Sequence, residues 1–109
     1  MIYETLHARE QVRALRMFYL KKERYDAYRN LIEAIREARV RIDANPTGGA
    51  PHPAPYPGMA RWGFHWIKAR RYWFGWSMAR GYPVVTNVFF DTSRMWMRVA
   101  PDEGDEEPF

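Results

Sequence analysis

The sequence contains no cysteine and no apolar run of 18 residues, and these two absences exclude several classes of protein. Without cysteine there is no disulfide framework, no cysteine-ligated zinc site and no thiol nucleophile. Without a long apolar run, no segment is predicted to span a membrane. The start of the chain mixes both signs of charge and lacks an apolar stretch, which predicts no signal peptide. We therefore expect a cytoplasmic protein.

Phosphate-binding glycine motifs and closely spaced histidines are also missing. Gly48-Gly49 has neither the spacing of a P-loop nor that of a dinucleotide-binding turn. His7, His52 and His65 are far apart in the sequence, without the short spacing that metal ligands commonly show. We therefore expect no cofactor, no metal ion and no catalytic residue.

Acidic residues are scarce until the end of the chain. Residues 1–100 hold all 17 Lys and Arg but only eight Asp and Glu, a net charge of +9. Residues 101–109 hold five acids and no base, a net charge of −5. A basic body with a short acidic tail is the charge asymmetry expected of a nucleic-acid-binding protein with an interaction tail.

The tail ends in Asp105-Glu106-Glu107-Pro108-Phe109, which resembles the C-terminal tip of bacterial single-stranded DNA-binding proteins. In that family the last Phe enters an apolar pocket on replication and repair proteins, and the acids before it meet basic residues around the pocket. The resemblance implies that Phe109 is an anchor, that Pro108 stiffens the tip, and that Asp105, Glu106 and Glu107 supply charge. The alternative is a tail that only keeps a basic protein soluble.

Residues 5–43 are predicted to be helical. Between Tyr28 and Ile42, apolar residues recur at steps of three and four and build one apolar face. Thr5 has the side chain of an N-cap. The apolar run at residues 17–20 leaves two interpretations open, because it fits either one long helix or two helices joined near residues 22–26.

The next segment, residues 44–58, contains five Pro and three Gly and is expected to be a loop between helices and sheet, or a flap over a cleft. Beyond it, residues 60–100 resemble an antiparallel meander with turn signals at residues 80–83 and 91–93. The order of elements predicts an α+β domain over residues 1–100, in which a helix or helical hairpin packs on a three- to four-stranded antiparallel sheet. A disordered acidic tail follows at residues 101–109. The candidate strands are 61–68, 70–79, 83–90 and 94–100.

In element order and composition the body is similar to ThermoDBP, an archaeal family of single-stranded DNA-binding proteins that lacks the OB barrel. That family packs helices on an antiparallel sheet with a basic, aromatic cleft. The similarity implies that a helices-then-sheet domain can bind single strands, and it covers the arrangement of elements without a shared motif.

Strand alternation divides the side chains of residues 61–100 between two sheet faces. One face is almost wholly apolar and is the predicted core face. Its members are Trp62, Phe64, Trp66, Tyr72, Phe74, Trp76, Met78, Met95, Met97 and Val99.

The opposite face and its flanks mix aromatic rings with guanidinium groups. Bases stack on such rings, at about 1–3 kcal/mol per base, while Arg neutralises phosphate. The sequence therefore predicts non-catalytic binding of single-stranded DNA or RNA, with replication or repair proteins as partners of the tail, and is compatible with a homodimer. The predicted contact residues are Arg61, His65, Arg70, Arg71, Trp73, Arg94, Trp96 and Arg98.

Two alternatives belong to other functional classes. Small basic toxins of the RelE/ParE type also place a helical hairpin before an antiparallel sheet, and their ribonuclease members cut RNA without metal. A comparable set here consists of His65, Arg71, Arg80, Tyr82 and Arg94, with Arg for the phosphate and Tyr or His for proton transfer. The other alternative is a small phage-type adaptor or inhibitor whose tail imitates the single-stranded DNA-binding protein tip.

Overall fold

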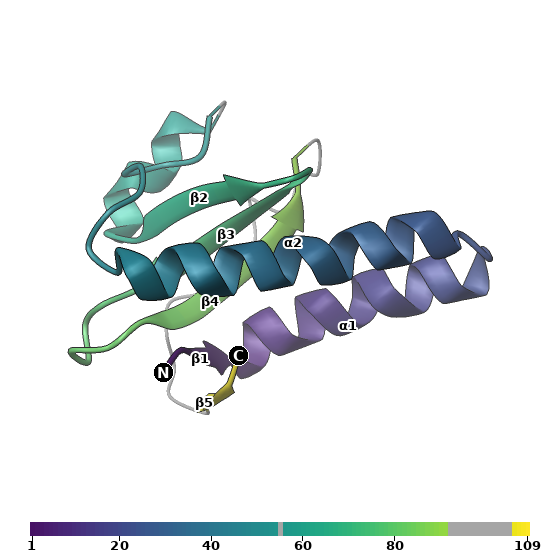
Figure 1. Ribbon diagram of the computed structural model, residues 1–109. Helices are drawn as coiled ribbons and strands as arrows, with labels where there is room; N and C mark the ends of the chain where they lie inside the picture. The colour runs from purple at the N-terminus through teal and green to yellow at the C-terminus, as the bar shows by residue number, and fades with distance from the viewer. Residues whose placement is uncertain (55, 92–105) are drawn as a thin grey trace.

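The computed structural model describes residues 1–54, 56–91 and 106–109, and for Trp62 and Glu106 it describes the backbone alone. Two helices cover one face of a five-stranded sheet (Figure 1). The α+β class with a helical hairpin is therefore confirmed. In the described ranges, neither helix has the length and apolar character needed to cross a membrane.

The helical region is a hairpin of two helices, α1 (Leu6–Lys21) and α2 (Tyr25–Ala44). Thr5 caps α1 as predicted, because its Oγ1 accepts a hydrogen bond of 3.2 Å from the backbone N–H of Ala8. The helices are joined through Glu23, whose φ of 54° lies in the left-handed region and reverses the chain. The break falls near the residues where the sequence allowed two helices.

The sheet has the order β2-β3-β4-β1-β5. The antiparallel meander is confirmed for its first three strands, which pair consecutively. Parallel pairing of β1 with β4 and antiparallel pairing of β5 with β1 were not predicted, and they make the sheet mixed. The strands are β1 (Tyr3–Thr5), β2 (His65–Ala69), β3 (Tyr72–Ser77), β4 (Val84–Phe90) and β5 (Glu106–Pro108).

The predicted strand boundaries are close for β4 and wrong at the start of β2. Residues expected to begin that strand form a short 3-10 helix, η1 (Pro57–Trp62), because Pro57 fixes a helical φ and Gly63 ends the turn at φ 68°. The predicted strand 94–100 lies outside the described residues.

The two faces of the sheet are both covered. On the helix face, Phe74, Trp76 and Val88 form one buried cluster with Leu31 and Ile42 of α2, and β4 packs mainly against α1. On the second face, Trp66 and Phe89 pack against Met59 of η1 and Phe64, with Tyr56 at the margin. The proline-rich segment that leads into η1 is therefore part of a cover over this face.

The predicted core face is wrong in β2, because the β2–β3 hairpin turns through two residues, Arg70 and Arg71. Trp66 then pairs with Gly75, and Ile67 pairs with Phe74, so even-numbered residues of β2 share a face with odd-numbered residues of β3. The prediction assumed the same parity in both strands. Trp66 and Phe64 are buried, but on the second face.

Gly75 makes room for the Trp66 indole on that face. A Cβ at Gly75 would lie 2.5 Å from a ring carbon of Trp66, so the indole would have to shift to admit any side chain there. The large ring therefore covers a strand position that has no side chain of its own.

Gln11 of α1 fills a gap in the sheet ladder. Its Oε1 accepts a 2.7 Å hydrogen bond from the buried backbone N–H of Val88, beyond the short stretch in which β1 pairs with β4. This side chain satisfies a strand donor that would otherwise lack a partner. It also fixes α1 across the sheet.

Candidate nucleic-acid surface and tail site

Three of the predicted nucleic-acid contacts meet at the β2–β3 hairpin: Arg70, Arg71 and Trp73. Lys68, which the prediction omitted, pairs across the strands with Trp73, and its ammonium lies 5.9 Å from the ring centroid. Arg71 places its guanidinium 5.0 Å from the Phe90 ring centroid. These residues form a basic, aromatic cluster at one end of the sheet.

The cations of the hairpin already have acidic partners. Lys68 and Arg71 both contact the Asp91 carboxylate at 3.1 Å, and Arg70 contacts Glu37 of α2 at 3.3 Å. Burial by itself raises the pKa of Asp91, but the hydrogen bonds and charges of Arg71 and Lys68 outweigh it and hold that pKa below its usual value. A phosphate would have to displace these carboxylates.

The other predicted contacts do not join the hairpin cluster. His65 lies at the opposite end of β2, where its ring stacks on Trp76 at 5.4 Å and its Nδ1 lies 2.9 Å from the Gly48 carbonyl oxygen. It therefore lies on the helix face, contrary to the predicted sharing of a face with Trp73. Arg61 belongs to η1. Arg94, Trp96 and Arg98 lie outside the described residues.

The residues considered for a ribonuclease are divided in the same way. His65 is at the end of the sheet where β3 turns into β4, and Tyr82 in that turn packs its ring on Tyr3 at 5.2 Å. Arg71 is at the other end, bound to Asp91. Arg94 is not among the described residues, so the described members form no single site.

A second basic and aromatic surface lies where the sequence analysis did not place it, on the helical arm. We use this name for residues 13–29, the end of α1 and the start of α2, which project beyond the strands (Figure 1). The arm carries six basic and two acidic residues, a net charge of +4. Four of the eight large hydrophobic residues recorded as exposed in the described chain gather here: Met17, Phe18, Leu20 and Tyr25.

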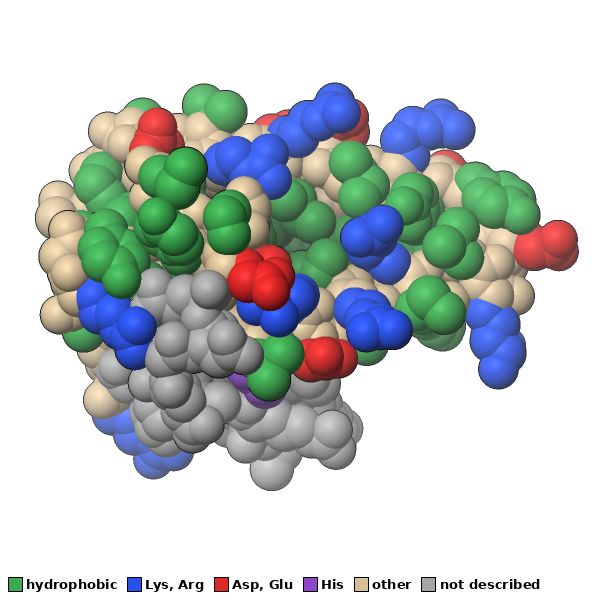
Figure 2. All heavy atoms as spheres, turned by 90° about the horizontal axis from the view of Figure 1, so that it is seen from below, with side chains coloured by type: hydrophobic (Ala, Val, Ile, Leu, Met, Phe, Trp, Pro, Cys, Tyr) green, Lys and Arg blue, Asp and Glu red, His purple; other side chains and the backbone are tan. Residues whose placement is uncertain are grey.

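Several cations of the arm carry no acidic partner among the described residues. Within residues 1–54, 56–91 and 106–109, no ion pair is present for Arg13, Lys21, Lys22 or Arg29, in contrast with the hairpin cluster. The guanidinium of Arg16 lies 5.8 Å from the Tyr28 ring centroid. Figure 2 shows Lys and Arg side chains interspersed with hydrophobic side chains along this part of the surface.

A shallow groove runs along α1 into the arm, with a volume of about 360 Å³. Arg9, Arg13 and Arg16 line it at helical spacing, and Met17 and Leu20 supply its apolar part. Glu4 also lines it. The groove thus joins a row of guanidinium groups to exposed apolar surface.

The tip of the acidic tail is docked on the body. Pro108 pairs with Tyr3 and Glu107 with Glu4 in an antiparallel ladder, and the Phe109 N–H donates a 2.9 Å hydrogen bond to the Ile2 carbonyl oxygen. The sequence predicted a disordered tail over residues 101–109, whereas residues 106–109 pair with the free edge of β1, which offers them backbone partners. Residues 101–105, including Asp105, lie outside the described residues.

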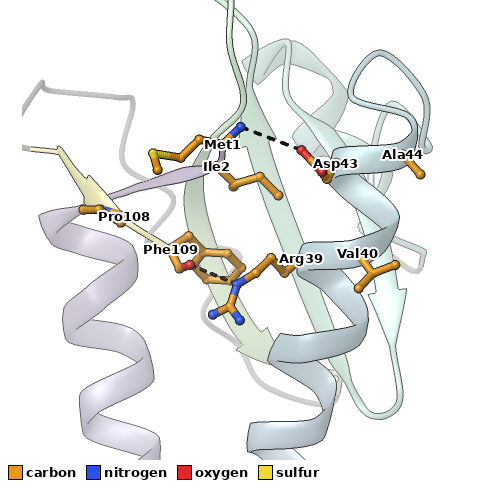
Figure 3. Close-up of a pocket in the computed structure, with 8 residues that line it drawn as sticks. All are labelled: Met1, Ile2, Arg39, Val40, Asp43, Ala44, Pro108 and Phe109. Carbon is orange, nitrogen blue, oxygen red and sulfur yellow. Dashed lines mark hydrogen bonds and ion pairs between the residues drawn. The ribbon is translucent and has the colours of Figure 1, made fainter.

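Phe109 enters an apolar site beside the core. Its ring meets Phe74 edge to face at 6.2 Å, and it packs against the core cluster that contains Ile2. Arg39 of α2 lies 5.7 Å from the ring centroid, and its Nε donates a 3.0 Å hydrogen bond to the Phe109 carbonyl oxygen. Figure 3 shows Arg39 reaching across to Phe109.

A cavity of about 620 Å³ adjoins the docked ring. Met1, Ile2, Val40 and Ala44 give it a largely apolar lining, and Asp43 stands at its rim, 3.9 Å from the N-terminal ammonium (Figure 3). We call the β1 edge together with Ile2, Arg39 and Phe74 the tail socket.

Arg9 connects the tail socket to the groove of the arm. Its Nε lies 3.0 Å from a Glu107 oxygen and 3.7 Å from a Glu4 oxygen, so it bridges two carboxylates that face each other across β1 and β5. Burial raises the pKa of Glu4 above its usual value and Glu107 adds to the rise, although Arg9 and Arg39 oppose it. The docked tip is therefore ion-paired with one of the cations that line the groove.

No protein-family model, curated protein or solved structure matches this chain. The case for each candidate surface therefore comes from the residues and contacts described above.

Sequence patterns held a signal for the arm that the prediction passed over. Met17, Phe18 and Leu20 stand in a continuous apolar run followed by Lys21 and Lys22, and a helix cannot bury every side of such a run. The tail socket left no such signal, because β1 and β5 have three residues each and lie at opposite ends of the sequence.

Proposed function

We propose that the protein binds single-stranded nucleic acid through the helical arm and the adjoining groove, and that it carries an acidic tip for protein partners. The observation that carries the proposal is the concentration of exposed rings on residues 13–29, together with cations that have no acidic partner in the described part of the chain. Guanidinium and ammonium groups neutralise phosphates, and exposed rings such as Phe18 and Tyr25 stack on bases.

The arm suits a single strand better than the β2–β3 hairpin does. At the hairpin, phosphate competes with Asp91 and Glu37 for the same cations, and Trp73 is already half-buried. On the arm, Phe18 is 46% exposed and Tyr25 is 56% exposed. A single strand offers unstacked bases to such rings, whereas a duplex hides its bases.

The experiment compares two triple variants with equal loss of charge. The arm variant is Arg13→Gln, Lys21→Gln and Lys22→Gln, and the control is Lys68→Gln, Arg70→Gln and Arg71→Gln at the hairpin. Fluorescence anisotropy with labelled oligo-dT, oligo-rU and duplex DNA measures affinity at two salt concentrations. We expect the arm variant to lose about 10–100-fold in single-strand affinity. The slope of log affinity against log salt concentration should also become shallower by about two units. The single-strand affinity of the control should change by about threefold or less.

Three outcomes would contradict the proposal. The first is a larger loss in the hairpin control than in the arm variant. The second is equal affinity for duplex and single strand. The third is binding to vesicles with anionic lipids in place of oligonucleotides, because a basic arm with exposed apolar residues also fits a membrane surface.

Intrinsic fluorescence separates the arm from the sheet face that the sequence predicted. The arm contains tyrosines but no tryptophan, and all five tryptophans follow residue 61. Binding on the arm should therefore leave tryptophan emission nearly unchanged, whereas stacking of bases on Trp73 should quench it.

A further inference from the structure

The tail socket combines three features that recognise a peptide strand. The β1 edge supplies backbone hydrogen-bonding groups, as the bond of 2.9 Å between the Phe109 N–H and the Ile2 carbonyl oxygen illustrates. Adding a strand to an exposed sheet edge is a common mode of peptide binding, in which backbone groups give affinity and side-chain pockets give specificity. Here the added strand has only three residues, Glu106–Pro108.

Specificity for an aromatic residue comes from the pocket at the end of that strand. Phe74, with no exposed surface, presents its ring to Phe109, and Arg39 closes the other side with a hydrogen bond to the Phe109 carbonyl oxygen. The adjoining cavity of about 620 Å³ continues past the ring along Val40 and Ala44. The pocket therefore accepts an aromatic ring with space beyond it.

Specificity for acidic residues comes from the cations beside the edge. Arg9 contacts Glu107 at 3.0 Å, and Arg39 faces the strand from α2. The ligand that meets these demands is an extended, acidic segment that carries Pro-Phe. We propose that the tail socket is a receptor for acidic Pro-Phe strands presented by other molecules, and that residues 106–109 are its built-in competitor.

The docked tip is held in a way that permits exchange. Its strand is short, and the Glu107 carboxylate is 58% exposed, so the ion pair with Arg9 is weak. However, tip and socket belong to one chain, so the tip has an effective concentration at the socket on the order of millimolar. A strand added from solution must compete with it. Lowering the affinity of the internal tip should therefore reveal the site.

The test uses the full chain with Phe109→Ala and a labelled peptide of residues 102–109, whose binding is followed by fluorescence anisotropy. We expect the variant to bind this peptide about tenfold more tightly than the wild type, because the ring pocket is vacant. A peptide ending in Pro-Ala should bind at least about tenfold more weakly, since it lacks the anchor. Equal affinity of the variant and the wild type, or equal binding of both peptides, would overturn the proposal.

Arg39 offers a matched pair of charge reversals in the Phe109→Ala background. Arg39→Glu should abolish peptide binding, whereas Arg36→Glu, one turn earlier in α2 and paired with Glu33, should leave it nearly unchanged. Equal losses in both variants would mean that net charge alone attracts the peptide and would overturn the proposal.

A measurement on the wild type keeps the test valid if Phe109→Ala does not fold. Unlabelled peptide is added in excess to the ¹⁵N-labelled full chain, and the Phe109 amide resonance is followed. Displacement should move it to a random-coil position, and an unchanged resonance at saturating peptide would overturn the proposal. Peptide binding at the tail socket is separate from nucleic-acid binding on the arm, since the peptide assays contain no oligonucleotide and their outcome is independent of the arm.

Discussion

The helical arm and the tail socket both present cations to an acidic chain, but they differ in what surrounds those cations. At the socket, Arg39 stands next to a buried aromatic core, and Phe74 and the β1 edge hold the bound segment. On the arm, Arg13 and Lys21 are exposed and stand among exposed side chains such as Phe18. Charge alone attracts any polyanion, whereas a strand edge and a pocket select a particular sequence.

The largest expected effect comes from truncating the ring that the core and the socket share. Phe74→Ala should lower the free energy of unfolding by about 3–5 kcal/mol, because a fully buried Phe leaves a cavity. The matched change on the arm, Phe18→Ala, should cost about 1 kcal/mol or less, since that ring is 46% exposed. Urea denaturation of both variants measures the free energy of unfolding. Similar losses in the two variants would contradict the expected difference between socket and arm.

The second largest effect is a difference in salt dependence between binding on the arm and docking of the tip. A fourfold rise in salt concentration should weaken single-strand binding by about 10–100-fold if the arm makes roughly four phosphate contacts. The docked tip should remain in place, because its backbone hydrogen bonds and the Phe109 ring do not depend on screened charges. Protection of the Phe109 amide from hydrogen exchange reports on the tip, and loss of protection at high salt would show that charge alone holds it.

Release of the tip should raise nucleic-acid affinity slightly. Phe109→Ala is expected to free Arg9, which then extends the row formed by Arg13 and Arg16 along the groove. One added phosphate contact is worth about two- to threefold at low salt. Anisotropy with oligo-dT measures the change, and Glu107→Gln is a control that frees Arg9 while keeping the ring. A fall in affinity for either variant would contradict this coupling.

The smallest effect concerns pH at the socket. Burial and the facing Glu107 raise the pKa of Glu4 despite Arg9 and Arg39, so its folded pKa lies above its unfolded pKa. The stability that this group contributes is fully present below the unfolded pKa and is lost as pH rises through the folded pKa. Glu4→Gln, which stays neutral, should therefore gain stability relative to the wild type as pH rises from about 4 to 7. Denaturation at both pH values tests this, and the opposite trend would mean that Arg9 dominates.

The elements that the sequence predicts well have either a repeating apolar pattern or a residue that marks a cap or a turn. Apolar steps of three and four identify α2, Thr5 marks the start of α1, and Gly81 with Pro83 marks the turn before β4. Three-residue strands have no such period, so β1 and β5 were missed and the tip was expected to be disordered.

The candidate site was harder to predict than the fold. Face assignment in β2 depended on the number of residues in the turn, and Arg70 adopts a φ of 56° there, which glycine would normally signal. Which cations have acidic partners depends on contacts between distant segments, such as Arg70 with Glu37 and Arg71 with Asp91. Composition therefore indicated a basic, aromatic surface but not its position.

One measurement tests the central claim that the two surfaces have separate ligands. The backbone amides of the ¹⁵N-labelled full chain are followed during titration with oligo-dT. We expect chemical-shift changes to gather in residues 13–29 and along the groove at Arg9, while the Phe109 amide keeps its bonded position. Changes that gather at residues 68–73 and leave the arm unaffected would contradict the account.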